Sequence, residues 1–132
     1  VDFLENTICL DSDFLIDMLR GKEQPVIWMK ENSDKKFCTT TINLFELFYG
    51  AYKSNSIKEI ESCERLLETL IVFSVSPNSA KIAGKIAANL DKTGNKVDFR
   101  DIIIASISIT ENLKLKTNNQ KHFENIKDLI LV

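Results

Sequence analysis

Acidic side chains stand at three separate places in the sequence where each could take part in chemistry. Asp11 directly follows the short apolar run TICL, Glu46 lies inside an almost wholly apolar stretch, and Asp98 and Asp101 precede the apolar run IIIA. A carboxylate is costly to bury unless it meets a cation, a hydrogen-bond donor or a metal ion. Each of these acids therefore needs an explanation beyond general solubility.

Asp11 is expected at the end of a strand, where the binding clefts of parallel sheets form. A helix cap is the alternative explanation, because Ser12 or Asp13 before Phe14 is also good capping chemistry. We interpret Asp13 mainly as that cap and Asp17 as part of the solvated face of the helix. For Asp11 both explanations stay open.

Glu46 is more informative because of its surroundings. The segment INLFELFYGAY, residues 42–52, leaves almost no polar face, and a helix that is apolar all round is normally buried. A carboxylate in such a helix is a metal ligand or half of a buried salt bridge to an Arg or Lys. Of the two, we favour metal ligation.

Asp98 and Asp101 open a very apolar segment, and acids at a helix N-terminus are stabilised by the helix dipole. One acid is enough to cap a helix, so the second needs another reason. Asp101 leads directly into the run IIIA and is expected to point into the protein. Asp98 adjoins Asn95 and Lys96 and is expected nearer the rim.

The segment KTNNQKHF carries a further polar group after a predicted strand. Thr117 ends that strand, and Asn118 and Asn119 follow it, in the same kind of position as Asp11. An amide oxygen can bind a metal ion or hold a water, although an ordinary Asx turn is the slightly favoured alternative. His122 is the only histidine, so we expect no zinc site and interpret it as a rim residue.

Taken together, Asp11, Glu46 and Asp101 could place three carboxylates in one cleft. Carboxylates packed this closely repel one another unless a hard cation neutralises them. Oxygen ligands suit Mg²⁺ or Mn²⁺, and such ions can hold a phosphodiester and activate a water for attack. The acids therefore predict metal-assisted phosphodiester chemistry.

Hydrophobic periodicity indicates the elements that must position these acids. Strands are expected at residues 7–10, 36–39, 72–75, 114–117 and 129–132, and helices at 14–19, 24–32, 42–53, 57–70, 78–92 and 100–111. Thr41 is expected to cap the helix at 42–53. The segment 100–111 is rich in β-branched residues, but its length and acidic start favour a buried helix. The alternation predicts an α/β fold with a central, mostly parallel β-sheet flanked by helices on both faces.

Length and composition narrow the class of protein. A chain of 132 residues fits one domain, residues 1–132, and the 44% hydrophobic and 27% charged residues are ordinary for a globular protein. The net charge of -2 provides no general basic field for nucleic acid, so phosphate must be held locally or through metal ions. We expect a cytoplasmic protein. No apolar run reaches the ~20 residues of a membrane span, VDFLENT lacks a signal-peptide pattern, and Cys9, Cys38 and Cys63 suggest buried thiols.

Four segments resemble, in order and spacing, the acidic motifs of PIN domains, and most closely those of VapC-type toxins. They are LDSDFLIDMLRG, TTTINLFELFYGA, VDFRDIIIASISI and TNNQKHFENI, and together they span nearly the whole chain. The resemblance implies a PIN-like fold and an Mg²⁺- or Mn²⁺-dependent endoribonuclease. It also implies an RNA substrate, a homodimer and a small antitoxin partner whose tail enters the acidic cleft. Residues 42–52 and 57–70 are candidate surfaces for that partner.

The resemblance also assigns roles to individual residues. It makes Asp11, Glu46 and Asp101 the first three acids of the site, with Asp98 as an auxiliary acid. The fourth position, often Asp in the family, is Asn119 here, which implies weaker binding of a second metal ion. Thr117 matches a hydroxyl residue that lines the site. All of these assignments depend on the same alignment of motifs.

Three other interpretations of the sequence compete with this one. LDSD imitates the aspartyl nucleophile motif of haloacid-dehalogenase-type phosphatases, but no Gly-Asp motif follows late in the chain. A receiver domain needs an acceptor Asp after its middle strand, where this chain has SVSPNS. A non-catalytic PIN-like domain that binds RNA or protein is the third, and the retained acids argue against it.

Overall fold

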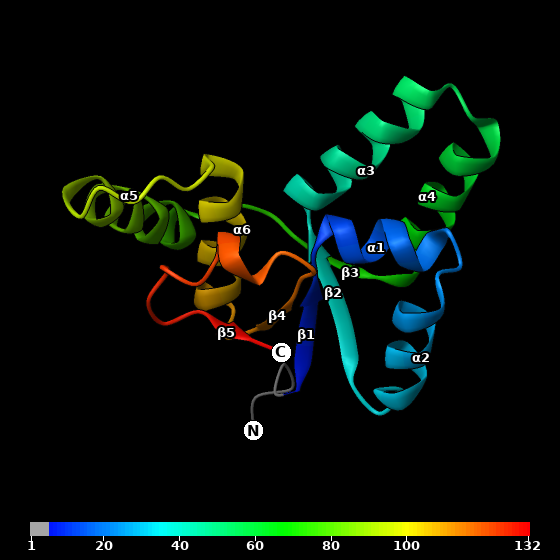
Figure 1. Ribbon diagram of the computed structural model, residues 1–132, viewed down its shortest axis with the longest axis horizontal. Coiled ribbons are helices and arrows are strands. Elements are labelled where there is room, and N and C mark those ends of the chain that lie inside the picture. The colour runs from blue at the N-terminus through cyan, green and yellow to red at the C-terminus, as the bar shows by residue number, and fades with distance from the viewer. Residues whose placement is uncertain (1–5) are drawn as a thin grey trace.

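The computed structural model describes residues 6–132, and its strands alternate with helices along the chain (Figure 1). The strands are β1 (Thr7–Leu10), β2 (Lys36–Thr40), β3 (Ile71–Phe73), β4 (Lys114–Lys116) and β5 (Ile130–Leu131). The helices are α1 (Ser12–Leu19), α2 (Glu23–Glu31), α3 (Thr41–Ser54), α4 (Ile57–Thr69), α5 (Pro77–Lys92) and α6 (Phe99–Thr110), with a 3-10 turn at Gln120–His122. Every predicted strand and helix is present, and each of its two ends lies within two residues of the predicted position.

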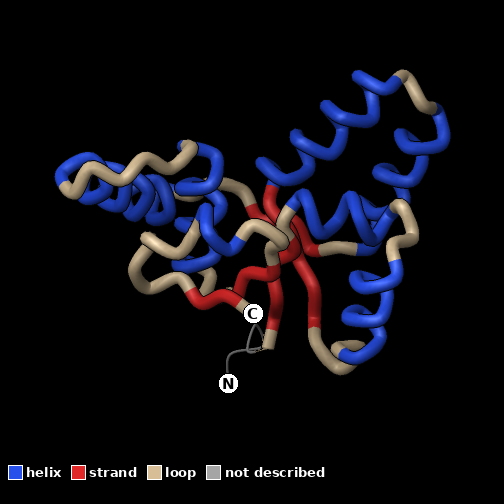
Figure 2. The backbone as a smooth tube through the Cα atoms, viewed as in Figure 1, coloured by secondary structure: helices blue, strands red, loops and turns tan. Residues whose placement is uncertain are grey.

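The five strands form one parallel sheet in the order β3-β2-β1-β4-β5. Figure 2 shows the strands in red between the helices. β1 lies in the middle, with β2 on one side and β4 on the other, so the strand order reverses at β1. A crevice forms beyond the carboxyl ends of the strands at such a reversal. The expectation that SVSPNS follows the middle strand was wrong, because it follows β3, which lies at the edge of the sheet.

Helices cover both faces of the sheet, as predicted. Alternate side chains of β1 serve the two faces, because successive residues of a strand point in opposite directions. Ile8 and Leu10 pack with α1, α3 and α4 in one core, and Cys9 packs with α6 and the C-terminal segment in the other. Figure 1 shows the first four helices on one side of the strands and α5 and α6 on the other.

α6 is a helix despite its β-branched residues. Six of its residues are buried, and burial within a sheet-covering layer outweighs the small propensity cost of Ile and Thr. The hydroxyls of Ser106, Ser108 and Thr110 donate to the carbonyl oxygens four residues earlier, at 2.6, 3.0 and 2.7 Å. These three hydroxyl groups thus find hydrogen-bond acceptors within their own helix.

α3 differs from its prediction in two respects. It is not buried all round: Leu47 and Ala51 face the core, but Phe45, Tyr49 and Tyr52 are each more than half exposed. Its N-cap is Thr40, whose hydroxyl accepts from the backbone of Asn43, and not Thr41. The nearly continuous apolar pattern concealed an exposed aromatic face, because periodicity alone cannot tell a core from a surface that awaits a partner.

The three cysteines are free and buried, as predicted. Across residues 6–132, no helix is long and apolar enough to cross a membrane. The expectation of no signal peptide used VDFLENT, of which residues 1–5 lie outside the described residues.

Candidate active site

An acidic pocket of about 220 Å³ lies beyond the carboxyl ends of the central strands. Asp11 follows β1, Glu46 comes from the second turn of α3, and Asp101 comes from the first turn of α6. The pocket is lined by Asp11, Ser12, Asp13, Glu46, Asp98, Arg100, Asp101, Asn119 and His122. The structure therefore brings together the acids that lie up to 90 positions apart in the sequence.

Asp11 is the most firmly held of these acids. Its Oδ2 accepts from the hydroxyl of Thr117 at 2.7 Å, and its Oδ1 accepts from Asn43 Nδ2 at 2.8 Å. Oδ1 also accepts from the backbone of Ser12 at 2.9 Å, so Asp11 is the N-cap of α1 as well as a pocket residue. Burial raises the pKa of Asp11, against the opposing effect of these three hydrogen bonds. Asp11 therefore caps α1 and lines the pocket at the same time.

Asn43 is a pocket-supporting residue that the sequence did not reveal. It is fully buried at the start of α3 and donates to both Asp11 and the hydroxyl of Ser12, each at 2.8 Å. Its own Oδ1 accepts from the hydroxyl of Thr40 at 2.7 Å. Asn43 fixes the orientation of Asp11 relative to α3, because all its hydrogen bonds are made inside the protein.

Glu46 is partly exposed and lies between the hydroxyl group of Ser12 and the guanidinium group of Arg100. Ser12 Oγ donates to Glu46 Oε1 at 2.8 Å. Arg100 Nη1 lies 4.0 Å from Glu46 Oε2, and the Arg100 and Glu46 side chains are 43% and 30% exposed. The salt bridge considered from the sequence therefore exists, but it is long and open to solvent and contributes little to stability.

Asp98 and Asp101 divide as their positions in the sequence predicted. Asp98 is the N-cap of α6, accepting from the backbone of Arg100 at 2.9 Å, and its side chain is 46% exposed. The Asp101 side chain is 21% exposed and faces the pocket. Burial, followed by repulsion from Asp11, raises the pKa of Asp101 to about 6. A hydrogen bond from Arg100 lowers the pKa of Asp98.

The loop after β4 joins the pocket through Asp13, and the assignment of Asp13 mainly to a cap was wrong. Its Oδ1 does accept from the backbone of Phe14 at 2.7 Å, but its Oδ2 accepts from Asn119 Nδ2 at 2.6 Å within the pocket. Asn118 Nδ2 donates to Asp17 at 3.0 Å. These contacts span more than 100 positions, which is why no local pattern could show them.

His122 lies at the rim, as predicted, with 60% of its side chain exposed. Its Nδ1 is 3.6 Å from Asp101 Oδ2. No second histidine exists in the sequence, and the other pocket side chains offer oxygen atoms or, in Arg100, only donors. The donor set therefore does not suit zinc.

Removing the charge of Asp101 should stabilise the protein in the absence of metal, and only at neutral pH. A carboxyl whose pKa is raised on folding destabilises the folded state above that pKa, near 6, and the penalty disappears below the ordinary value of 3.8. We expect Asp101→Asn to raise the free energy of unfolding by roughly 1–3 kcal/mol at pH 7.5 in EDTA. At pH 4, close to the ordinary value of 3.8, the difference should fall below about 1 kcal/mol.

Urea unfolding of the two proteins at both pH values measures this difference. Asp98→Asn is the matched control, because that carboxyl has a lowered pKa and should destabilise slightly instead. An Asp101→Asn protein that is less stable than wild type at pH 7.5 would show that the carboxylate is a favourable cap and not a repelled pocket acid.

The pocket residues carry the kinds of atoms that bind a hard divalent cation, but their side chains are not arranged as a complete set of ligands. Carboxylate and amide oxygens are the ligands of Mg²⁺ and Mn²⁺. Burial, with a smaller contribution from repulsion between the acids, raises the pKa of Asp11 and of Asp101, and a bound cation would oppose both effects. Among residues 6–132, however, no three Asp, Glu, His or Cys side chains are grouped closely enough to hold an ion as they stand. Glu46 accepts a hydrogen bond from Ser12, and Asp101 lies near His122. Both acidic side chains are partly exposed, so each has room to change rotamer toward a bound ion.

The comparisons with known proteins agree with this geometry. A family model described as the PIN domain matches residues 8–129. Ribonuclease VapC2 of Haemophilus influenzae is 30% identical over 118 residues, which cover 89% of each protein. The tRNA(fMet)-specific endonuclease VapC of Salmonella typhimurium is 29% identical over 118 residues, again 89% of each.

Two solved structures share the fold along nearly the whole chain. One is VapBC2 from Rickettsia felis bound to a DNA fragment from its promoter, with a TM-score of 0.84, 26% identity and coverage of 96% of this chain and 97% of that chain. The other is DNA-bound VapBC from Salmonella typhimurium, with a TM-score of 0.82, 27% identity and 96% of both chains covered. The predicted fold class and the family resemblance are thereby confirmed.

Proposed function

This chain belongs to the PIN domain family, and we propose that its acidic pocket is the site where it hydrolyses RNA phosphodiester bonds as the toxin of a toxin–antitoxin pair. The observation that carries the proposal is the pocket itself. Five carboxylates meet beyond the carboxyl ends of the central strands, and burial raises the pKa of three of them. Such a concentration of repelling acids is destabilising without a bound cation, and is typical of a functional site.

We propose Mg²⁺ or Mn²⁺ as the cofactor, held by Asp11, Glu46 and Asp101 with weaker support from Asn119. When bound, the cation would neutralise phosphate charge and lower the pKa of a water molecule for attack. Asp11 suits the role of central ligand because Thr117 and Asn43 fix both its oxygens from the protein side. These hydrogen bonds come from residues behind Asp11, so they orient its carboxylate and leave the pocket in front of it free for a cation.

The remaining site residues act around this core. Thr117 positions Asp11, and Asp98 caps α6, which places Asp101 in the pocket. Asn119 joins the loop after β4 to Asp13. We assign substrate hydrolysis to the group as a whole: the acids hold the cation, and the pocket, which is open to solvent, admits the phosphodiester and the attacking water.

An aspartyl-nucleophile phosphatase is disfavoured by the surroundings of Asp11. A nucleophilic carboxylate needs an oxygen that can reach the phosphorus atom. Both oxygens of Asp11 already accept hydrogen bonds from buried donors, of which Asn43 and Thr117 are almost wholly enclosed. The geometry suits an oriented ligand better than an attacking group.

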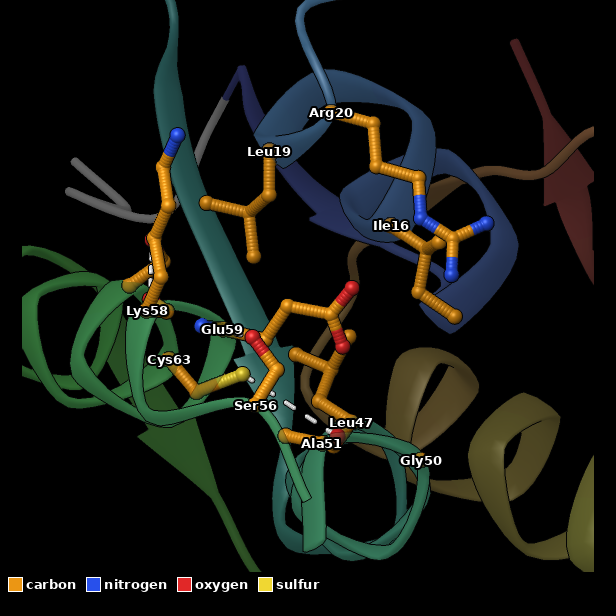
Figure 3. A pocket seen from close by; sticks show the side chains of 11 residues that line it. Ile16, Leu19, Arg20, Leu47, Gly50, Ala51, Ser56, Lys58, Glu59 and Cys63 are labelled. Atoms are coloured by element: carbon orange, nitrogen blue, oxygen red, sulfur yellow. Dashed lines mark hydrogen bonds between the residues drawn. The ribbon is translucent and has the colours of Figure 1, made fainter. Parts of the chain in front are cut away.

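We propose that the antitoxin occupies a groove between α1, α3 and α4 (Figure 3). The groove has a volume of about 350 Å³. Its apolar lining includes Ile16, Leu19 and Leu47, and charged residues of both signs also line it, namely Arg20, Lys58 and Glu59. An amphipathic segment fits an apolar groove with a charged rim. Solved VapBC structures of the same fold support a protein partner of this kind.

Gly50 offers a way to block the groove without disturbing the fold. It lies on α3 in the groove wall, and a Cβ atom placed there would meet no atom within 4 Å. Gly50→Lys should therefore leave RNA cleavage unchanged and raise helix stability by about 1 kcal/mol. Binding of the purified cognate antitoxin, measured by calorimetry, should weaken at least about tenfold. Undiminished binding would place the antitoxin elsewhere.

We also propose that the chain forms a homodimer through the exposed aromatic face of α3. Phe45, Phe48, Tyr49 and Tyr52 form stacked pairs with ring centroids 6.1 Å apart, and Lys53 lies 5.7 Å from the Tyr49 ring. A contiguous exposed aromatic surface of this kind is typical of protein interfaces. Sedimentation at micromolar concentration tests it, and a monomeric mass would contradict it.

A further inference from the structure

Arg100 is the one pocket residue with a permanent positive charge. Of the nine residues that line the acidic pocket, five are acids, and only Arg100 and His122 can carry a positive charge. An RNA backbone that approaches this pocket meets five carboxylates, and a single divalent cation offsets two of those charges. A fixed cation at the entrance would reduce the repulsion that remains.

The geometry of Arg100 leaves one edge of its guanidinium group available. Its Nε and Nη2 each donate to one oxygen of Asp98, both at 3.2 Å. Its Nη1 makes no hydrogen bond within residues 6–132 and has only the 4.0 Å ion pair with Glu46. A guanidinium group has five N–H donors in a planar fork, so an edge that matches a phosphate remains free.

Asp98 holds Arg100 in this orientation. Besides the two side-chain hydrogen bonds, its carboxylate accepts from the backbone of Arg100 at 2.9 Å, which fixes both ends of the arginine relative to the start of α6. The Arg100 side chain is 43% exposed, so these contacts add little to folding stability. An oriented but solvent-exposed arginine is typical of a binding group and not of a structural one.

We propose that Arg100 is a substrate-binding residue that takes a phosphate oxygen of the RNA beside the scissile bond, and that Asp98 is the positioning residue that aims it. The proposal rests on the proposed function and deepens it by assigning a contact to the substrate backbone. It also gives Asp98 a role that differs from ligation of the metal ion. Because the contact is to phosphate, it carries affinity and not sequence preference.

Three variants separate this role from a structural one. Arg100→Gln removes the charge and the fork, Arg100→Lys keeps a point charge without the fork, and Arg65→Gln is the matched control on the exposed face of α4. With a short single-stranded RNA, we expect Arg100→Gln to raise KM about tenfold and to change kcat less than about threefold. The KM of Arg100→Lys should lie between those of wild type and Arg100→Gln, and the KM of Arg65→Gln should equal that of wild type.

Salt dependence and binding without cleavage give independent readouts. The slope of log KM against log salt should fall by about 0.7 in Arg100→Gln, the value for one lost phosphate contact on a single strand. In EDTA, fluorescence anisotropy of a labelled RNA should show about tenfold weaker binding. The melting temperature in EDTA, and its rise with Mn²⁺, should stay as in wild type.

The outcomes are distinct for the two proposals. If wild type binds the RNA but does not cleave it, the proposed function fails, and the anisotropy comparison still decides the role of Arg100. Equal RNA affinity for Arg100→Gln and wild type, or no RNA binding by wild type, would overturn the role of Arg100. Loss of the Mn²⁺ effect in Arg100→Gln with KM unchanged would also overturn it, because Arg100 would then be positioning the metal ligands.

Discussion

Replacing Asp101 with Asn is expected to reduce RNA cleavage at least about 100-fold, since loss of even an outer partner of a metal ligand commonly costs 10–100-fold. Asp101 faces the pocket with a pKa raised to about 6, and its carboxylate gains most from a bound cation. Steady-state cleavage of a labelled RNA in millimolar Mn²⁺ measures the loss. The circular dichroism spectrum should be unchanged, because Asp98 and not Asp101 caps α6.

Asp98→Asn is the matched control for this loss, three residues away on the same helix. Asp98 is 46% exposed at the rim and holds Arg100, so its substitution should raise KM and leave measurable cleavage. An inactive Asp98→Asn protein beside an active Asp101→Asn protein would contradict this division of the acids. The third acid would then be Asp98, and Asp101 would only contribute to the start of the helix.

Replacing Glu46 with Gln is expected to abolish cleavage while the fold survives. The amide oxygen of Gln can still accept from Ser12 Oγ, which now donates to Glu46 at 2.8 Å. The 4.0 Å pair with Arg100 is exposed to solvent, so its loss should change the free energy of unfolding by less than about 1 kcal/mol. Mn²⁺ should raise the melting temperature of wild type and raise that of Glu46→Gln much less.

Activity and melting temperature together separate the two explanations of Glu46. A metal ligand gives an inactive but stable variant with a reduced response to Mn²⁺. A Glu46 that serves only in the exposed pair with Arg100 gives instead an active variant, with a change of less than about 1 kcal/mol and an undiminished response to Mn²⁺. An active Glu46→Gln protein would remove Glu46 from the site altogether.

The acids of the site could be predicted from the sequence because each one breaks an otherwise apolar pattern. Asp11 ends the run TICL, Glu46 interrupts the apolar pattern of α3, and Asp101 precedes IIIA. The parallel sheet could be predicted for a similar reason, since short apolar runs alternate with longer amphipathic ones. In both cases the pattern that supports the prediction lies within about a dozen consecutive residues, so it can be seen without knowledge of the fold.

The contacts that support the acids could not be predicted, because the partners lie far apart in the chain; the resemblance placed Thr117 in the site but did not show that it holds Asp11. Asn43 contacts Asp11 across 32 positions, and Thr117 contacts Asp11 across 106. An Asn near a helix start is explained locally by capping, so nothing in the sequence marks Asn43 as a buried link between two elements. Arg100 was missed likewise, as one more charged residue at the start of α6.

The exposed face of α3 shows a different limit. Its aromatic residues gave the same apolar signal as a core, and only the packing of Leu47 and Ala51 against α1 and α4 shows which face is covered. Hydrophobicity records that a side chain avoids water, but not whether its partner belongs to the same chain.

Cleavage of labelled RNA by the purified chain, free of any partner protein, tests the central claim most directly. A tRNA pool is a suitable substrate because relatives are named tRNA(fMet)-specific endonucleases. We predict cleavage in millimolar Mn²⁺ or Mg²⁺, none in EDTA, and none by Asp11→Asn prepared in the same way. Cleavage that persists in EDTA, or that Asp11→Asn retains in full, would contradict a metal-dependent active site in the acidic pocket.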